Sequence, residues 1–297
     1  MAGDFRLAMI GLDTSHSVEF PRLMQGDAPE NRRISGLRVT RALRFPSPFQ
    51  AEEGQDKRAA EIAAWGVETG TDFAKTVQNA DGILLEINDP ALHWTYFQKA
   101  AETGLPIFID KPLADTVQNG RKIVELAQKK KLKCWSASSL RFFPSLVATA
   151  EKHPTPDRIS VYGALGTAPA GSSLVWYGVH THEMLNRLMG NGAKSVFAHE
   201  DEAGITTTVE YGGPRRGIVE CIKGFWQYGG RAQAGGETST FVNDDSAGTY
   251  SNLMRQLKAF FLEGTAPIPL DNALEILAIM EAGERSLASG KNEAVRL

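Results

Sequence analysis

The N-terminal part of the chain alternates short apolar runs with longer segments of helical period, and this alternation constrains the fold most. Strand-like apolar runs cover Phe5–Ile10 and residues 37–45, 82–87, 106–109 and 133–136. Helical patterns lie between them, at residues 56–65, 90–103 and 115–131. Strands that alternate with helices form a parallel sheet covered on both faces. We therefore predict an α/β domain of Rossmann type over residues 1–138.

The pattern changes after Arg141. Helices are predicted for Pro144–Lys152, for residues 182–189 and, with a proline-containing break at 266–269, for residues 253–289. Strands are predicted for Arg158–Leu165 and for residues 195–199, 205–211 and 217–225. Strands that are grouped together favour a mostly antiparallel sheet. We predict an α+β domain with an open sheet over residues 139–297.

Composition excludes several classes of protein. The chain has 297 residues, enough for two domains, and a net charge of -3 with both signs interspersed, which argues against a nucleic-acid-binding surface. No apolar run approaches the roughly 20 residues needed to span a bilayer. The two cysteines, Cys134 and Cys221, lie in no metal-binding spacing. We expect a cytoplasmic protein with a small-molecule substrate and no nucleic-acid or membrane partner.

The first strand leads into a turn that departs from the usual dinucleotide-binding pattern. Gly11 takes the first glycine position, but Asp13 takes the second and His16 the third. Glycines at these positions let the backbone approach a pyrophosphate at a helix N-terminus, and a carboxylate there repels it. Thr14 and Ser15 offer hydroxyl donors to a phosphate, although Asp13 and Thr14 are equally suited to capping the helix.

The second cofactor signal is an acidic residue after the second strand, which binds the ribose hydroxyls of NAD. No acid follows the predicted strand at residues 37–45 directly. Arg44 and Ser47 would instead favour the 2′-phosphate of NADP. We expect NAD or NADP as the cofactor and leave the choice between them open.

Residues 82–143 carry an ordered set of motifs. A strand ends in Glu86 and leads through Asn88 and Pro90 to a helix near His93. The next strand ends in the Asp-Lys-Pro-Leu-Ala segment at residues 110–114, and residues 138–144 follow the long helix. In this order and spacing the motifs resemble the Gfo/Idh/MocA family of sugar and inositol dehydrogenases, with an aspartate in place of the glutamate of that family.

The resemblance implies an oxidoreductase that transfers a hydride between nicotinamide and a sugar, polyol or related substrate. It places Lys111 beside the nicotinamide and the substrate hydroxyl. An ammonium group there stabilises a developing alkoxide or relays a proton. The residues predicted by this resemblance to bind the cofactor are Gly11, Asp13, Thr14, Ser15, His16, Asn88, Pro90, His93, Asp110 and Lys111.

In the second domain the family histidine, the usual general acid and base, falls on His180. Trp176 stands where the family has an aspartate four residues earlier, so the usual pair is missing. We predict Lys111 and His180 as the catalytic residues, and Trp176 and Tyr177 as rings that stack on a sugar face. The predicted substrate-binding residues are Lys111, Arg141, Trp176, Tyr177, His180, His182 and Glu183.

A second hypothesis keeps the fold without the redox cofactor. Asp13, His16, His180 and His182 are residue types that bind metals, and with Glu183 they would support a metal-assisted lyase, isomerase or hydrolase. Against it, His180 and His182 share a face on a strand but not on a helix.

Two further expectations complete the analysis. A non-catalytic sugar-binding or regulatory protein is a third, weaker hypothesis, because Lys111 and His180 are both present. Under the dehydrogenase hypothesis we assign no metal ligands. The resemblance also implies that a C-terminal helix at Pro267–Ser289 packs back on the first domain, and that a homodimer or homotetramer forms through the C-terminal sheet.

Overall fold

The computed structural model describes residues 3–297, and the chain divides into two compact units. Unit 1 consists of Met1–Ala114, Lys122–Ser136 and Tyr250–Leu270. Unit 2 consists of Asp115–Arg121, Ala137–Thr249 and Asp271–Leu297. Each unit is therefore assembled from three separate stretches of the sequence.

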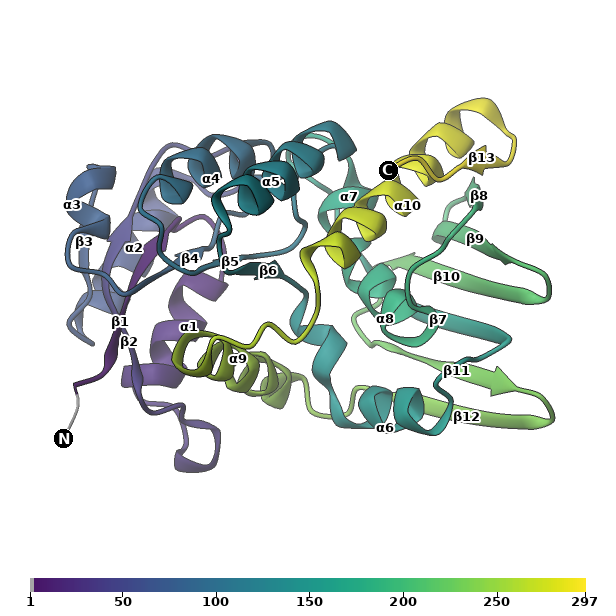
Figure 1. Ribbon diagram of the computed structural model, residues 1–297, viewed down its shortest axis with the longest axis horizontal. Coiled ribbons are helices and arrows are strands. Elements are labelled where there is room, and N and C mark those ends of the chain that lie inside the picture. The colour runs from purple at the N-terminus through teal and green to yellow at the C-terminus, as the bar shows by residue number, and fades with distance from the viewer. Residues whose placement is uncertain (1–2) are drawn as a thin grey trace. The chain divides into compact units, whose positions relative to one another are not determined.

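Unit 1 contains a six-stranded sheet in which every pairing is parallel. Its strands are β1 (Phe5–Ile10), β2 (Leu37–Leu43), β3 (Glu68–Gly70), β4 (Gly82–Leu85), β5 (Ile107–Ile109) and β6 (Cys134–Ser136). The spatial order is β3-β2-β1-β4-β5-β6 (Figure 1). The chain thus winds outward from β1 to β3, then returns to the other side of β1. In such sheets ligands bind beyond the carboxyl ends of the strands at this reversal.

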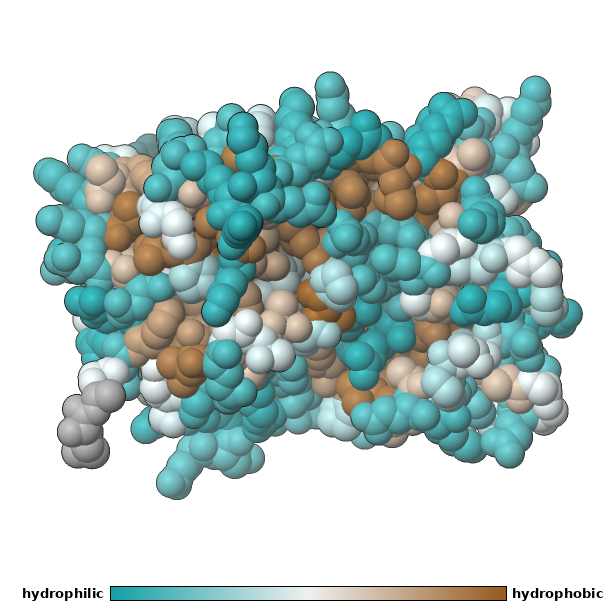
Figure 2. Space-filling model, viewed as in Figure 1, coloured by the Kyte–Doolittle hydropathy of each residue, from teal (hydrophilic) through white to brown (hydrophobic). Residues whose placement is uncertain are grey.

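Helices cover both faces of this sheet. They are α1 (His16–Gln25), α2 (Glu52–Ala63), α3 (Phe73–Val77), α4 (His93–Ala101), α5 (Val117–Lys130) and α9 (Ser246–Glu263), with short 3₁₀ turns η1 (Glu30–Arg32) and η2 (Pro90–Leu92). Helices α4 and α5 lie on one face, and α1 and α9 on the other (Figure 1). Figure 2 shows hydrophilic side chains over α4 and α5, as expected for helices that present one face to solvent.

Aromatic side chains of α9 complete the core of unit 1. The ring of Phe261 lies 5.6 Å from that of Phe5 on β1. The ring of Phe260 lies 6.0 Å from that of Trp135 on β6, which in turn contacts Phe108 on β5. A segment more than 100 residues downstream of β6 therefore seals one face of the sheet.

Unit 2 contains a seven-stranded sheet in the order β12-β11-β7-β10-β9-β8-β13. Strands β7 and β10 are parallel and all other pairings are antiparallel. The predicted fold class, a parallel Rossmann-type sheet followed by a mostly antiparallel one, is confirmed. The strands of unit 2 are β7 (Arg158–Leu165), β8 (Ser195–Glu200), β9 (Gly204–Gly212), β10 (Arg215–Lys223), β11 (Gly229–Ala234), β12 (Glu237–Val242) and β13 (Glu293–Ala294).

One face of this second sheet is buried under helices of the same unit. These are η3 (Ser139–Phe142), α6 (Pro144–Lys152), α7 (Ser173–Trp176), α8 (Val179–Met189) and α10 (Leu270–Ser289). Helix α8 packs so closely on β10 that a Cβ on Gly217 would lie 2.3 Å from a methyl carbon of Leu185. On the opposite face Phe197 is 43% exposed, and its cross-strand partner Thr208 is half-buried.

The structure differs from the sequence predictions in several places, and the short elements β3, α3, α7 and β13 were among those not predicted. Helix α8 begins at Val179 rather than at 182, so both neighbouring histidines lie on it. Strands β11 and β12 were not predicted, because their glycines and small polar residues show little apolar alternation. Residues 250–270, which include most of α9, belong to unit 1, whereas α10 beyond Leu270 belongs to unit 2. Within residues 3–297 no helix has the length and apolar character needed to cross a membrane.

Candidate active site

The turn after β1 lies directly against the end of β4. Gly11 has a φ of +120°, and a Cβ there would lie 1.9 Å from the carbonyl oxygen of Glu86. No other residue fits without moving one of the two segments. This close approach brings the start of α1 beside the residues that follow β4.

Asp13 is buried in this turn, and the hydrogen bonds of its carboxylate are made with other segments rather than with α1. Its carboxylate accepts hydrogen bonds from the hydroxyl of Ser47 at 2.6 Å and from the main-chain N–H of Asn88 at 2.9 Å and of Asp89 at 3.3 Å. Asp13 therefore joins the turns after β2, β1 and β4. This line across the sheet is the one that the pyrophosphate of a dinucleotide follows in this kind of fold.

The remaining predicted cofactor residues lie around the same two turns. Thr14 Oγ1 accepts a hydrogen bond from the N–H of His16 at 3.3 Å, and Ser15 is exposed. Pro90 begins η2. His93 is fully buried, with ring nitrogens 2.8 and 3.2 Å from the carbonyl oxygens of Ile87 and Leu113, so it holds the segments after β4 and β5 together.

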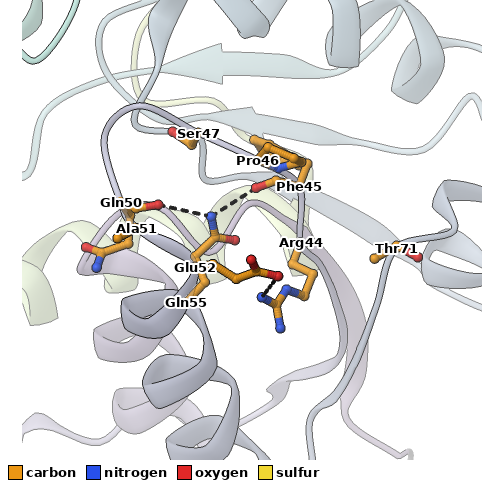
Figure 3. A pocket seen from close by; sticks show the side chains of 9 residues that line it. All are labelled: Arg44, Phe45, Pro46, Ser47, Gln50, Ala51, Glu52, Gln55 and Thr71. Carbon is orange, nitrogen blue, oxygen red and sulfur yellow. Dashed lines mark hydrogen bonds and ion pairs between the residues drawn. The ribbon is translucent and has the colours of Figure 1, made fainter.

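A pocket of about 440 Å³ lies beyond β2. Figure 3 shows that Gln55, from α2, points its amide nitrogen at the carbonyl oxygens of Phe45 and Gln50. The other amide atom, Oε1, is buried without a hydrogen-bond partner among residues 3–297. Arg44 forms ion pairs with Asp56 and, at 3.7 Å, with Glu52. The acids beside the pocket thus come from α2 rather than from the strand end.

Asp110 and Lys111 follow the last residue of β5, at the edge of the sheet that carries the β1 and β4 turns. Lys111 is 6% exposed, and no hydrogen bond or ion pair of its ammonium group is found among residues 3–297. Lysine is a hydrogen-bond donor only, so the ammonium group of this largely buried side chain requires an acceptor from solvent or from a ligand. Lys111 is thus available to an acceptor on a ligand.

Beneath Lys111 lies a buried cluster of His16, Glu86 and Asp110. Nδ1 of His16 is 2.8 Å from Oδ2 of Asp110 and 3.7 Å from Oε2 of Glu86. Burial lowers the pKa of His16, but the two acids outweigh it and raise that pKa overall. Burial raises the pKa of Glu86, and repulsion from Asp110 adds to this rise. Burial also opposes ionisation of Asp110, but His16 and Lys111 outweigh it and lower the pKa of Asp110. These directions favour an ion pair between His16 and Asp110 and the protonated form of Glu86.

In unit 2, His180 lies within a group of aromatic rings. Its ring is 5.1 Å from that of Tyr177 and 6.1 Å from that of Tyr228, and Tyr177 in turn lies 5.1 Å from Trp176 and 5.7 Å from Trp226. Trp226 is 65% exposed, whereas His180 is buried. The rings therefore form a wall that runs from solvent to the imidazole.

The same imidazole is held by Ser138. The hydroxyl of Ser138 and Nδ1 of His180 share a hydrogen bond of 2.7 Å, and that hydroxyl also accepts one from the N–H of Leu140 at 3.1 Å. One ring nitrogen is thereby fixed by the protein, which orients the ring and its other nitrogen.

The other predicted substrate residues of unit 2 have polar partners inside the protein. His182 is fully buried, with Nδ1 2.8 Å from the carbonyl oxygen of Gly178 and Nε2 3.3 Å from Oγ1 of Thr207. Burial lowers the pKa of His182 to about 4. Glu183 and Arg141 form a buried ion pair at 3.0 Å. The carboxylate of Glu183 also accepts the N–H of Ser138, at 3.1 Å.

Sequence reasoning gave no role to several residues that define these sites. Glu86 was detectable as a single acid at the end of an apolar parallel strand, an expensive place for a charge. Ser138 and Tyr228 left no such signal, because their roles depend on contacts with a distant helix. Of the residues in the metal hypothesis, only His16 lies in a group that could share an ion within residues 3–297.

Comparison with known proteins supports the predicted family for the first sheet. Residues 5–138 match a family described as an oxidoreductase family with an NAD-binding Rossmann fold, Gfo/Idh/MocA. The family predicted from the motifs is therefore confirmed over these residues. No curated protein matches the chain.

Solved structures extend the likeness of the fold to the whole chain. The scyllo-inositol dehydrogenase of Lactobacillus casei has a TM-score of 0.80 at 12% identity, over 99% of this chain and 98% of its own. A myo-inositol dehydrogenase of Corynebacterium glutamicum has a TM-score of 0.77 at 14% identity, over 99% of both chains. GenD2 from gentamicin A biosynthesis, solved with NAD, has a TM-score of 0.80 at 14% identity, over 100% of this chain and 98% of its own.

The residues of this Gfo/Idh/MocA domain fit a nicotinamide dinucleotide at both ends. The pocket beyond β2 is lined by polar side chains that include Arg44 and Gln55, and Lys111 lies beyond β5. Between these ends the carboxylate of Asp13 accepts hydrogen bonds from the main-chain N–H groups of the turn after β4. Binding of a dinucleotide therefore requires the side chain of Asp13 to move away from these N–H groups.

Proposed function

We propose that the chain is an NAD(P)-dependent dehydrogenase or reductase that acts on a CH–OH group of a sugar, polyol or related compound. The observation that carries the proposal is Lys111, buried without a hydrogen-bond partner in the described residues, at the reversal of a β3-β2-β1-β4-β5-β6 sheet. Ligands of such sheets bind at this edge. The family of residues 5–138 supports the same reaction class.

Lys111 would act on the oxygen of the substrate. The nicotinamide supplies a hydride acceptor or donor when it is bound. As a CH–OH group is oxidised, negative charge develops on its oxygen, and an ammonium group desolvated by its surroundings stabilises that charge strongly. Lys111 would donate a hydrogen bond to this oxygen and hold the carbon in place for transfer.

His180 would receive or return the hydroxyl proton. A neutral imidazole accepts a proton at one nitrogen when the other is held, and Ser138 holds Nδ1. The rings of Trp176, Tyr177 and Trp226 beside it offer apolar faces with polar edges, which suit a ring-shaped polyol. Inositol dehydrogenases of the same fold support this substrate class.

The proposal is tested with the purified full-length chain. Titration with NADH and with NADPH, followed by quenching of tryptophan fluorescence, measures cofactor binding and the preference between the two. A panel of inositols, aldoses and amino sugars is then screened with NAD⁺ and NADP⁺ by the absorbance of the reduced nicotinamide. If neither NADH nor NADPH binds at millimolar concentration, the proposal is overturned.

Two further predictions concern the whole protein rather than its chemistry. Homo-oligomerisation through the sheet of unit 2 stays a prediction, supported by exposure of Phe197 on the helix-free face. Light scattering after size-exclusion chromatography would test it, with Phe197→Glu expected to favour the monomer. The cytoplasmic location likewise stays a prediction, consistent with free Cys134 and Cys221.

A further inference from the structure

We propose that His16, Glu86 and Asp110 bind one divalent transition-metal ion, for which Zn²⁺ is the best match. The three side chains come from separate segments that meet at one edge of the sheet of unit 1: the start of α1, the residue after β4 and the residue after β5. Within residues 3–297 they form the one group of three metal-binding side chains whose donor atoms lie within 4.8 Å of one another.

The first argument is that the donor atoms are buried and incompletely satisfied. Nδ1 of His16 and Oδ2 of Asp110 pair at 2.8 Å, but both carboxylate oxygens of Glu86 lack a hydrogen bond within residues 3–297, and Oε2 lies 3.7 Å from Nδ1 of His16. The side chains of His16, Glu86 and Asp110 are 6%, 0% and 1% exposed, respectively. Each buried polar group left without a partner costs about 1–3 kcal/mol, and charged groups cost more. A fully buried carboxylate with no hydrogen bond, beside a second carboxylate and an imidazole, indicates a missing ligand.

Protons alone do not satisfy the carboxylate of Glu86. A proton on Glu86 serves one of its two oxygens, and a proton on Nδ1 of His16 can be directed at one acceptor at a time. A divalent cation can contact all three side chains at once. It also neutralises the two carboxylates together, which is the usual condition for burying paired charges of one sign.

The donor set indicates the kind of metal. One imidazole and two carboxylates, with no thiolate, suit Zn²⁺ and its neighbours, whereas Mg²⁺ prefers oxygen alone. Bonds of about 2.0–2.2 Å in a tetrahedral site place donor atoms about 3.3–3.6 Å apart. The Nδ1–Oδ2 and Nδ1–Oε2 distances, 2.8 and 3.7 Å, bracket this value, and the three donor atoms all lie within 4.8 Å of one another, so small side-chain adjustments would complete the site.

The positive charge of Lys111 limits the number of cations that the site can hold. Its ammonium group lies close enough to interact with all three side chains, so it opposes binding of a second cation. A bound ion would fix the position of Asp110 and therefore the direction of the Lys111 side chain. The inference does not rest on the proposed function, because no atom of a dinucleotide takes part in it.

The experiment measures metal directly in the full-length chain. Protein freed of metal with a chelator is titrated with Zn²⁺ by calorimetry and with Co²⁺ by visible absorption, and Mg²⁺ serves as a comparison. The variant Glu86→Gln removes one ligand at nearly constant size. Glu102→Gln, at an exposed residue that pairs with Lys130, is the matched control. His182→Gln tests the histidine of the other metal hypothesis.

The expected result is one Zn²⁺ per chain for the wild type, Glu102→Gln and His182→Gln, with binding to Glu86→Gln weaker by about 100-fold or more. The Co²⁺ spectrum of the wild type should show d–d bands without a thiolate charge-transfer band. Absence of Zn²⁺ and Co²⁺ uptake, unchanged binding by Glu86→Gln, or a thiolate band that places the ion on a cysteine would each overturn the proposal. The wild-type titration decides even where Glu86→Gln fails to fold.

Discussion

Asp13 and Asn88 join the turn after β1 to the turn after β4. The main-chain N–H of Asn88 donates to Oδ1 of Asp13 at 2.9 Å, and its side-chain amide donates to the carbonyl oxygen of Asp13 at 3.1 Å. In a dinucleotide-binding fold this place is kept open by glycine. Here the carboxylate of Asp13 accepts the hydrogen bonds from main-chain N–H groups that a phosphate group would accept.

Replacing Asp13 with glycine should therefore tighten binding of NADH or NADPH. Removal of a negative charge within about 4 Å of a phosphate relieves roughly 1–4 kcal/mol of repulsion, so the dissociation constant should fall about tenfold or more. The variant should also melt at a lower temperature, because three hydrogen bonds to the carboxylate are lost. Fluorescence titration and thermal unfolding measure the two effects.

Asp13→Asn is the matched control, since it removes the charge and keeps the shape. It should reproduce most of the gain in affinity with less loss of stability. Weaker binding in both variants would mean that the carboxylate contacts the cofactor, for example through a ribose hydroxyl, and would contradict the steric and electrostatic argument.

Lys111→Ala should lower kcat by about 10²–10⁴-fold, the usual contribution of a positioned acid–base or charge-stabilising group. The cofactor dissociation constant should change much less, because the role lies in the transition state. Circular dichroism checks that the variant is folded, because the ammonium group also interacts with the buried carboxylates of Glu86 and Asp110. A rate near that of the wild type would refute the role.

Ser138→Ala should alter the pH dependence of turnover. The hydroxyl fixes Nδ1 of His180 at 2.7 Å, so its loss frees the ring to rotate and to change tautomer. We expect kcat to fall about 10-fold or more and the pH profile of kcat/KM to shift. Ser139→Ala, on the adjacent residue of η3, is the control. Parallel losses in both variants would indicate damage to the fold instead.

His182 should make the protein less stable in mild acid. The folded chain keeps the imidazole neutral because burial lowers its pKa from 6.5 to about 4. Between these values the unfolded chain binds more protons, so stability is complete above pH 6.5 and falls as pH decreases toward 4. The loss amounts to about 3 kcal/mol over this window. Urea unfolding at a series of pH values measures it.

The control for that titration is His182→Gln, which cannot take up a proton. Its absolute stability should be lower, since the contacts with Gly178 and Thr207 change. Its dependence on pH between 4 and 6.5 should nevertheless be flatter than that of the wild type. Equal slopes in the two proteins would mean that carboxylates, rather than His182, govern acid unfolding.

Local patterns were sufficient to predict the fold. The apolar runs of β1, β4 and β5 are short, bounded by polar residues and separated by helical periods, which leaves a parallel sheet as the consistent arrangement. The strands β11 and β12 were missed because they owe their structure to pairing with β7 and with each other rather than to their own residues.

The sites were predictable only where a motif carries the chemistry. Lys111 and His180 could be found by position in a motif, but their surroundings could not. Glu86 and His16 are 70 residues apart, and only the packing of the β1 turn against β4 makes them neighbours. Likewise, nothing local to Asp13 shows that its carboxylate is directed at the β4 turn instead of at α1.

Helix α9 has a consequence for how the protein is made. Its phenylalanines cover the aromatic core of unit 1, yet it lies at Ser246–Glu263, more than four fifths of the way along the chain. A ribosome therefore releases all six strands of the first sheet long before the part of the face beneath α9 can be covered. During synthesis that face needs a chaperone or transient contacts, and a recombinant fragment that stops at residue 138 would expose it permanently.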